Sequence, residues 1–404
     1  MRRGISLPET KERRSLLSAA IAEEPESLLE AWSRWRGALA SPEAIEGADQ
    51  RLFPIVWRRV RKHCVDDPWA PAFSATVKRA WKRNHIVVAQ AADALGTLEG
   101  AGIRAVAFKG VGLLLACYED VSARPTADID LLVHPRDFKR AVRCLQPGRP
   151  IALRSGHAVS LEEPGRLQID VHRMPSQQGL VAGKPAQGLD ALLDLIIGRS
   201  EISTSLGRHR VPTLTDLLFL QLINAFAHSL GDGEAEETWI VDLMEAVRRP
   251  AFDQAAFLDL IDRAGAAGLF QDRFQSCQAL LPPCLDAIAD AMATLPLDEA
   301  GHRQRAAFSA LRDRTRDGAV EDPFRALWFA LRGEEEHAAP MSLKLAYVRS
   351  CTGDLVGSLR FSGSLAEANV GSVRHYLAKG VEALGGGAKR EAQPDAAARG
   401  DRKT

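Results

Sequence analysis

Hydrophobic residues recur at helical spacing over most of the first hundred positions of the chain. The clearest run lies between His85 and Gly102, where apolar side chains return every three or four residues until glycines end the pattern. Its apolar members are Val88, Ala92, Leu95 and Leu98. We therefore predict a helical N-terminal region over residues 1–102, in which large aromatic side chains anchor the helix packing. The expected anchors are Trp32, Trp35, Trp57 and Trp81.

From residue 103 the spacing changes to that of strands. Residues 103–108 form a short apolar run bounded by glycines, which predicts a buried strand, and the apolar residues 111–118 then predict a short helix. A second strand is predicted at 128–133. Pro135 then opens a helix whose apolar residues share one side. That side holds Phe138, Ala141, Val142 and Leu145.

Polar and apolar residues alternate in two of the predicted strands. Because strand side chains alternate between faces, Asp128 and Asp130 lie on one face of the first strand. In the later strand, residues 166–172, Asp170 and His172 share the polar face. We predict the order β-α-β-α-β-β over residues 103–175, forming a small mixed sheet with helices on one face.

The chain turns helical again from about residue 189. Thr213 and Asp216 stand at the spacing of a capping box before a strongly apolar helix, and helical patterns continue to about residue 380. Residues 385–404 carry almost no large apolar side chain, which predicts a disordered tail. With a mainly helical region over 176–384, we expect an α+β fold in which the small mixed sheet lies between N-terminal and C-terminal helical regions.

Composition and charge narrow the function classes. The 404 residues suit two or three structural units, and 46% hydrophobic and 26% charged residues are typical of a soluble protein. The formal net charge is zero, which argues against a protein that coats long nucleic acids. None of the six cysteines stands at a metal-binding spacing, and no apolar run reaches the roughly 18 residues of a membrane span. We expect a cytoplasmic protein with reduced thiols and no membrane contact.

Candidate chemistry begins with three carboxylates. Asp128 and Asp130 point the same way from one predicted strand, and Asp170 lies on the polar face of another. If the two strands are neighbours, the three acids converge and repel one another unless cations neutralise them. Mg²⁺ fits such a site because it prefers oxygen ligands and shares them with substrate phosphates, and Mn²⁺ would satisfy the same acids.

A second feature suits phosphate. Lys109 and Gly110 stand between a predicted strand and a predicted helix, where a glycine lets phosphate approach the backbone and the lysine adds a positive charge. Arg124, just before the acid pair, could hold another phosphate oxygen. Each motif alone usually has a plainer interpretation, namely solvated acids at a strand end or an ordinary turn. Their combination favours a site for metal and phosphate.

The motifs between Phe108 and His172 resemble the polymerase-β-type nucleotidyltransferase superfamily and, more narrowly, its bacterial "uncharacterised nucleotidyltransferase" family. That family's pattern is a Lys-Gly, an apolar helix ending near a tyrosine, an Arg-Pro followed by Asp-Ile-Asp-Leu-Leu-Val, and a later acid two residues before a histidine. This chain carries the pattern as Lys109-Gly110, Tyr118, Arg124-Pro125, Asp128 to Val133 and Asp170-Val171-His172. His157, His228 and the segment from Trp239 to Asp242 are similar to further parts of the family.

The resemblance implies a nucleotidyltransferase that holds metal on Asp128, Asp130 and Asp170. Such enzymes move a nucleoside monophosphate from an NTP to an acceptor and release pyrophosphate, with one acid assisting deprotonation of the acceptor. Lys109, Gly110, Arg124 and His172 are the nucleotide-binding residues that the resemblance implies. We expect a small-molecule, peptide or protein acceptor rather than a long nucleic acid.

Two alternatives stay open. The superfamily usually has Gly-Ser where this chain has Lys109-Gly110, so the fold could serve a non-catalytic protein that binds a nucleotide or a partner. The γ-phosphate could also be the group that moves. His228 and Asp242 are expected to be structural residues or residues at the rim of the site.

Overall fold

The structure of the chain is a computed structural model that describes residues 11–45, 47–154, 157–175, 186–203, 206–228 and 238–316. The chain divides into two compact units, Met1–Glu335 and Glu336–Thr404, and every described residue belongs to the first. The expected tail at 385–404 and the helical pattern beyond residue 316 lie outside the described residues. Among the helices that are described, none has the length and apolar character needed to cross a membrane.

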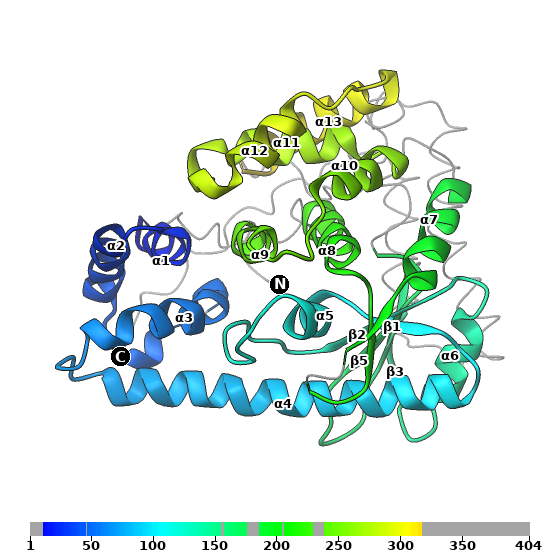
Figure 1. Ribbon diagram of the computed structural model, residues 1–404. Coiled ribbons are helices and arrows are strands. Elements are labelled where there is room, and N and C mark those ends of the chain that lie inside the picture. Colours follow the sequence, from blue (N-terminus) through cyan, green and yellow to red (C-terminus); the bar gives the residue numbers. More distant parts are fainter. Residues whose placement is uncertain are drawn as a thin grey trace, which may run out of the picture. The chain divides into compact units, whose positions relative to one another are not determined.

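The N-terminal region is helical, as predicted. It contains α1 (Lys11–Ile21), α2 (Pro25–Ala38), α3 (Gly47–Val60) and α4 (Ala70–Gly100), with single 3₁₀ turns at Pro42–Ala44 and Arg61–His63. Figure 1 shows α4 as a long helix that runs past α5 and the strands of the sheet. It contacts α3 near one end and strands β1 and β2 further along, so one helix connects the N-terminal region to the sheet.

An aromatic cluster forms the core of the N-terminal helices. Trp32 lies between Trp35, Phe53, Trp57 and Phe73, with ring centroids 5.1–6.3 Å from its own. Three of the four expected tryptophan anchors are thus buried, but Trp81 is 46% exposed and the prediction for it was wrong. Trp81 lies at the edge of the buried stripe of α4, where its ring packs on His85 of the same helix at 4.0 Å.

The central sheet has five strands in the order β1-β2-β5-β4-β3. The strands are β1 (Ala105–Ala107), β2 (Ile129–Val133), β3 (Ile151–Arg154), β4 (Ala158–Leu161) and β5 (Ile169–His172). Strands β2 and β5 are parallel and the other pairs are antiparallel, so the sheet is mixed, as predicted. It has one strand more than predicted, because strands of three or four residues offer too few positions for alternation to stand out.

Helices cover both faces of this sheet, so the expectation of helices on one face was wrong. Helices α4 and α6 (Phe138–Leu145) contact the strands, and Ile129, Leu131 and Val133 on one face of β2 are fully buried. On the other face, Val106 and Leu132 share a core cluster with α7 (Ala186–Gly198) and α8 (Leu214–His228). Only part of that face is polar, and its apolar part needs a helical cover as well.

The C-terminal region is mainly helical, as predicted, but it also contains an unpredicted hairpin. Strands β6 (Glu201–Ser203) and β7 (His209–Val211) pair antiparallel in a sheet of their own. The remaining elements are α9 (Thr238–Val247), α10 (Gln254–Arg263), α11 (Ala267–Ser276), the 3₁₀ turns Gln278–Leu280 and Pro283–Leu285, α12 (Asp286–Ala293) and α13 (Glu299–Arg316). Thr213 caps the start of α8, as the sequence indicated, because its Oγ1 accepts a hydrogen bond from the backbone N–H of Asp216 at 3.3 Å.

Candidate functional site

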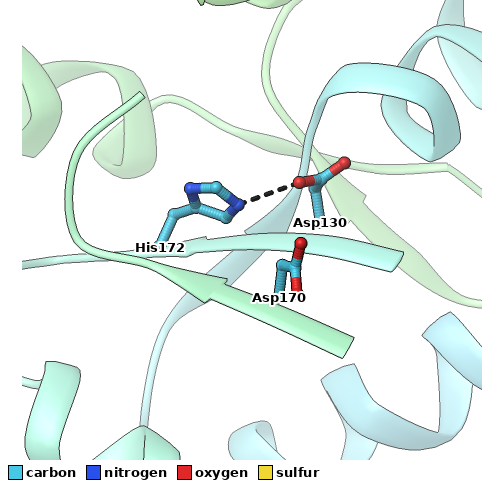
Figure 2. Close-up of side chains that lie close together, drawn as sticks. All are labelled: Asp130, Asp170 and His172. Atoms are coloured by element: carbon cyan, nitrogen blue, oxygen red, sulfur yellow. Dashed lines mark hydrogen bonds and ion pairs between the residues drawn. The ribbon is translucent and has the colours of Figure 1, made fainter. Parts of the chain in front are cut away.

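The register of two parallel strands creates the site. Asp130 of β2 stands beside Asp170 of β5, and Leu132 stands beside His172. Side chains at neighbouring positions of paired strands point to the same face, so the pairing brings the polar face of the two strands together. Figure 2 shows Asp130, Asp170 and His172 gathered on one side of the sheet. We expected the acids to converge if their two strands were neighbours. The strands are neighbours, and Asp130 and Asp170 do converge.

Three side chains form a group that fits a metal ion. Asp130, Asp170 and His172 each offer one ligand atom, and these atoms lie within 4.8 Å of one another. His172 Nε2 is 2.8 Å from Asp130 Oδ1, the contact drawn in Figure 2, and Gln168 Nε2 donates to Asp170 Oδ1 at 2.7 Å. Two carboxylate oxygens and an imidazole nitrogen are ligands that Mn²⁺ accepts readily and Mg²⁺ accepts in part.

Lys109 supplies the positive charge at this group. Its Nζ lies 2.7 Å from Asp130 Oδ1 and 3.5 Å from His172 Nε2. The residue follows Phe108, whose backbone N–H donates to the carbonyl of Asp130 at 3.2 Å, so β2 itself locates the lysine. Lys109 has φ 48°, and it is the sole non-glycine residue with positive φ in the described part of the chain. Strained backbone of this kind is common at functional sites.

Burial and the neighbouring charges shift the pKa values of Asp130 and His172, which are in contact with each other. Burial alone raises the pKa of Asp130, but the Lys109 charge and the hydrogen bond from His172 outweigh it and hold that pKa well below its ordinary value. Burial and the Lys109 charge lower the pKa of His172. A lowered pKa favours the neutral imidazole, and the contact with Asp130 is a hydrogen bond in the tautomer that carries its proton on Nε2. Its buried Nδ1 has no hydrogen-bond partner.

Asp128 lies outside the group of three. It precedes β2, whose first residue is Ile129, and its carboxylate is not among the atoms that converge within 4.8 Å. Burial and the charge of Asp130 nevertheless raise the pKa of Asp128 to about 6, with a smaller contribution from Asp170. Asp128 is thus close enough to the other acids to feel their charges.

Gly110 and Arg124 lie together, next to Lys109. A Cβ added to Gly110 would meet Thr126 Oγ1 at 2.8 Å and Arg124 Nη1 at 3.3 Å, so the glycine lets α5 (Lys109–Ala116) approach the segment before β2. Arg124 makes a bidentate ion pair with Asp242 of α9, through Nε at 2.8 Å and Nη2 at 3.0 Å. Asp242 was expected to be a structural or rim residue, and it is buried at this pair.

Of three further residues near the site, Tyr118 and His157 belong to segments that the family resemblance had marked, and Asn84 does not. Tyr118 donates its hydroxyl to Asp242 Oδ1 at 2.6 Å. Asn84 of α4 is fully buried and binds the backbone of Arg124 and Thr126, a role that its place in a helical pattern did not reveal. The ring of His157 lies 5.6 Å from that of His172. The side chain of His228 lies outside the described residues.

Comparison with known proteins identifies the family of the chain. The family described as "uncharacterised nucleotidyltransferase" matches residues 47–282, more than half of the chain, from α3 through the whole site to the helices that follow it. No curated protein matches the chain. The chain therefore belongs to the uncharacterised nucleotidyltransferase family and is a transferase enzyme.

Proposed function

We propose that this protein transfers a nucleoside monophosphate from an NTP to an acceptor in a metal-dependent reaction. The observation that carries the proposal is the convergence of Asp130, Asp170 and His172 within 4.8 Å, with Lys109 in contact with Asp130. An NTP brings a triphosphate whose charge needs cations, and this site combines metal-binding atoms with a lysine. The acceptor we favour is a small molecule, a peptide or a protein.

In this proposal the acids hold one or two divalent cations. Asp130 and Asp170 are direct ligands, and Asp128 completes the set from the turn before β2. A bound Mg²⁺ or Mn²⁺ would neutralise charge on the phosphates and orient them. We expect one of the acids to assist deprotonation of the acceptor.

The basic residues have separate roles in the proposal. Lys109 contacts Asp130 in the structure, and we expect its ammonium to turn to the triphosphate when a metal takes over the charge of Asp130. Gly110 lets α5 begin close to the segment that carries Arg124, so the first N–H groups of α5 and the guanidinium lie near one another. His172 fixes the Asp130 carboxylate through its hydrogen bond.

A two-label experiment tests the reaction type. The protein is incubated with Mg²⁺ or Mn²⁺, a mixture of candidate acceptors, and an NTP labelled on either the α- or the γ-phosphate. We expect the α-label to reach an acceptor while the γ-label leaves as pyrophosphate, and we expect Asp130→Asn to abolish both events. Transfer of the γ-label would show a phosphotransferase instead. Undiminished transfer in Asp128→Ala and Asp130→Ala would reject the proposed site.

A further inference from the structure

Arg124 is held in one orientation by its contacts with Asp242 and Asn84. Its Nε and Nη2 donate to the two oxygens of Asp242, and a bidentate pair fixes the plane of a guanidinium. Tyr118 donates to the same carboxylate, which fixes the carboxylate in turn. The backbone carbonyl of Arg124 accepts a hydrogen bond from buried Asn84 at 3.0 Å. Both ends of the arginine are therefore immobilised.

The remaining guanidinium nitrogen lies beside Gly110. Neither bond to Asp242 uses Arg124 Nη1, and this atom would lie 3.3 Å from a Cβ added to Gly110. Gly110 follows Lys109, whose Nζ contacts Asp130. Arg124 Nη1 thus lies beside the first turn of α5, within the group of residues to which the proposed function assigns the triphosphate.

The cost of burying this pair makes a purely stabilising role a poor explanation. Asp242 is buried and Arg124 is mostly so, and a buried ion pair is often no more stable than an apolar replacement. What the pair does provide is a fixed direction for a permanently charged donor. Burial lowers the pKa of Arg124, but the charge of Asp242 outweighs this and raises it, so the guanidinium remains protonated.

We propose that Asp242 and Tyr118 are positioning residues for the NTP, which hold Arg124 so that its Nη1 meets the triphosphate beside Lys109 and Gly110. The inference rests on the proposed function and deepens it. It makes α9, which lies more than 100 residues beyond Arg124 in the chain, part of the nucleotide site. Neither residue touches the nucleotide; each acts through Arg124.

The chain contains a matched control for this arrangement. At the start of α8, Arg199 makes the same kind of bidentate pair with buried Asp216, and Thr213 donates its hydroxyl to Asp216 Oδ2 at 2.8 Å. Each of the variants Asp242→Asn and Asp216→Asn therefore neutralises a buried carboxylate that pairs with an arginine and accepts a hydrogen bond from a hydroxyl group. We expect a general loss of stability in both variants, whereas we expect a specific loss of triphosphate binding in Asp242→Asn alone.

The test compares dissociation constants for the NTP with Mg²⁺ and for the nucleoside of the same base. We expect Asp242→Asn to weaken NTP binding about tenfold, the size of one charge-assisted hydrogen bond, and to change nucleoside binding less than about twofold. Asp216→Asn should leave the ratio of the two constants unchanged. Tyr118→Phe keeps the ion pair and should give a smaller loss in the same direction. If Asp242→Asn does not fold, Tyr118→Phe still tests the inference.

The outcomes separate this inference from the proposed function. If the unmodified protein binds no NTP, the proposed function fails and the inference fails with it. If the unmodified protein binds NTP and neither Asp242→Asn nor Tyr118→Phe changes the ratio, the inference alone is wrong. In an Arg124→Gln background, Asp242→Asn should cause no further loss of NTP binding. An additional loss of the same size there would show that Asp242 acts independently of Arg124.

Discussion

At the scale of single residues, the chemistry centres on one carboxylate oxygen. Asp130 Oδ1 receives both Lys109 Nζ and His172 Nε2, so three side chains from two strands and a helix start share one point. Alternation in the sequence placed Asp130 and Asp170 on polar faces, and this was confirmed. The bond between Lys109 and Asp130 could not be predicted, because it depends on a positive φ that lysine seldom adopts.

The pH dependence of stability should report on Asp128. Its pKa rises to about 6 in the folded protein, so the folded state favours the neutral acid, and stability is lost as the pH rises from about 4 through 6. Asp128→Asn removes this loss. Urea unfolding with EDTA present gives the free energy of unfolding of both proteins. Relative to the unmodified protein, we expect Asp128→Asn to be more stable at pH 7.5 than at pH 4 by up to about 3 kcal/mol. An equal difference at both pH values would contradict this account.

The strained backbone at Lys109 predicts an unusual order of stabilities. Both Lys109→Ala and Lys109→Gly remove the ammonium beside Asp130, but only glycine adopts φ 48° without strain. We therefore expect the glycine variant to be more stable than the alanine variant by about 1 kcal/mol in chemical denaturation without metal. In an ordinary helix the order is reversed, so a more stable alanine variant would mean that φ at this position is negative.

At the scale of elements, parallel pairing of β2 with β5 makes the site, and α5 brings the lysine to it. The strands themselves followed from short apolar runs and alternation. Their order did not, because β5 lies next to β2 while β3 and β4, which precede β5 in the chain, lie on its far side. Helix α6 was predicted correctly, since Phe138, Ala141, Val142 and Leu145 are all buried. The hairpin β6–β7 was missed because each strand has three residues.

The approach of α5 to the sheet depends on Gly112. A Cβ there would lie 2.7 Å from Leu217 Cδ1 and 2.8 Å from the carbonyl oxygen of Ala107, so Gly112→Ala should cost about 1–3 kcal/mol in the free energy of unfolding. Gly96, inside α4, has open space around its Cβ position, and Gly96→Ala should stabilise the protein by about 0.5–1 kcal/mol. Thermal unfolding of the two variants compares them directly. Equal effects would show that α5 is not packed this closely.

At the scale of the whole molecule, the N-terminal helices share a core with the C-terminal region. Val241 and Met244 of α9 pack in the cluster that contains Trp32 and Phe53, and α9 also supplies Asp242 to Arg124. The sequence predicted two helical regions around a small sheet, and that description holds for the described residues. Nothing in the sequence indicated that α9 contacts both the N-terminal helices and Arg124, because such contacts depend on tertiary packing rather than on local spacing.

Two tryptophans test where this shared core lies. Trp32 is 3% exposed and is surrounded by aromatic rings, so Trp32→Ala should cost about 3–5 kcal/mol. Trp81 is 46% exposed on α4, and Trp81→Ala should cost less than about 1 kcal/mol. Urea unfolding followed by circular dichroism measures both. A large cost at Trp81 would show that another part of the protein covers it.

The most direct test of the central claim is the melting temperature of the protein with each NTP, with and without Mg²⁺. A ligand at a hundredfold excess over its dissociation constant adds about 2.7 kcal/mol of stability to the state that binds it. We predict that at least one NTP raises the melting temperature only when Mg²⁺ is present, and that this increase disappears in the Asp128→Ala/Asp130→Ala variant. No increase with any NTP, or an increase that persists in the double variant, would contradict a metal-dependent nucleotide site at Asp130.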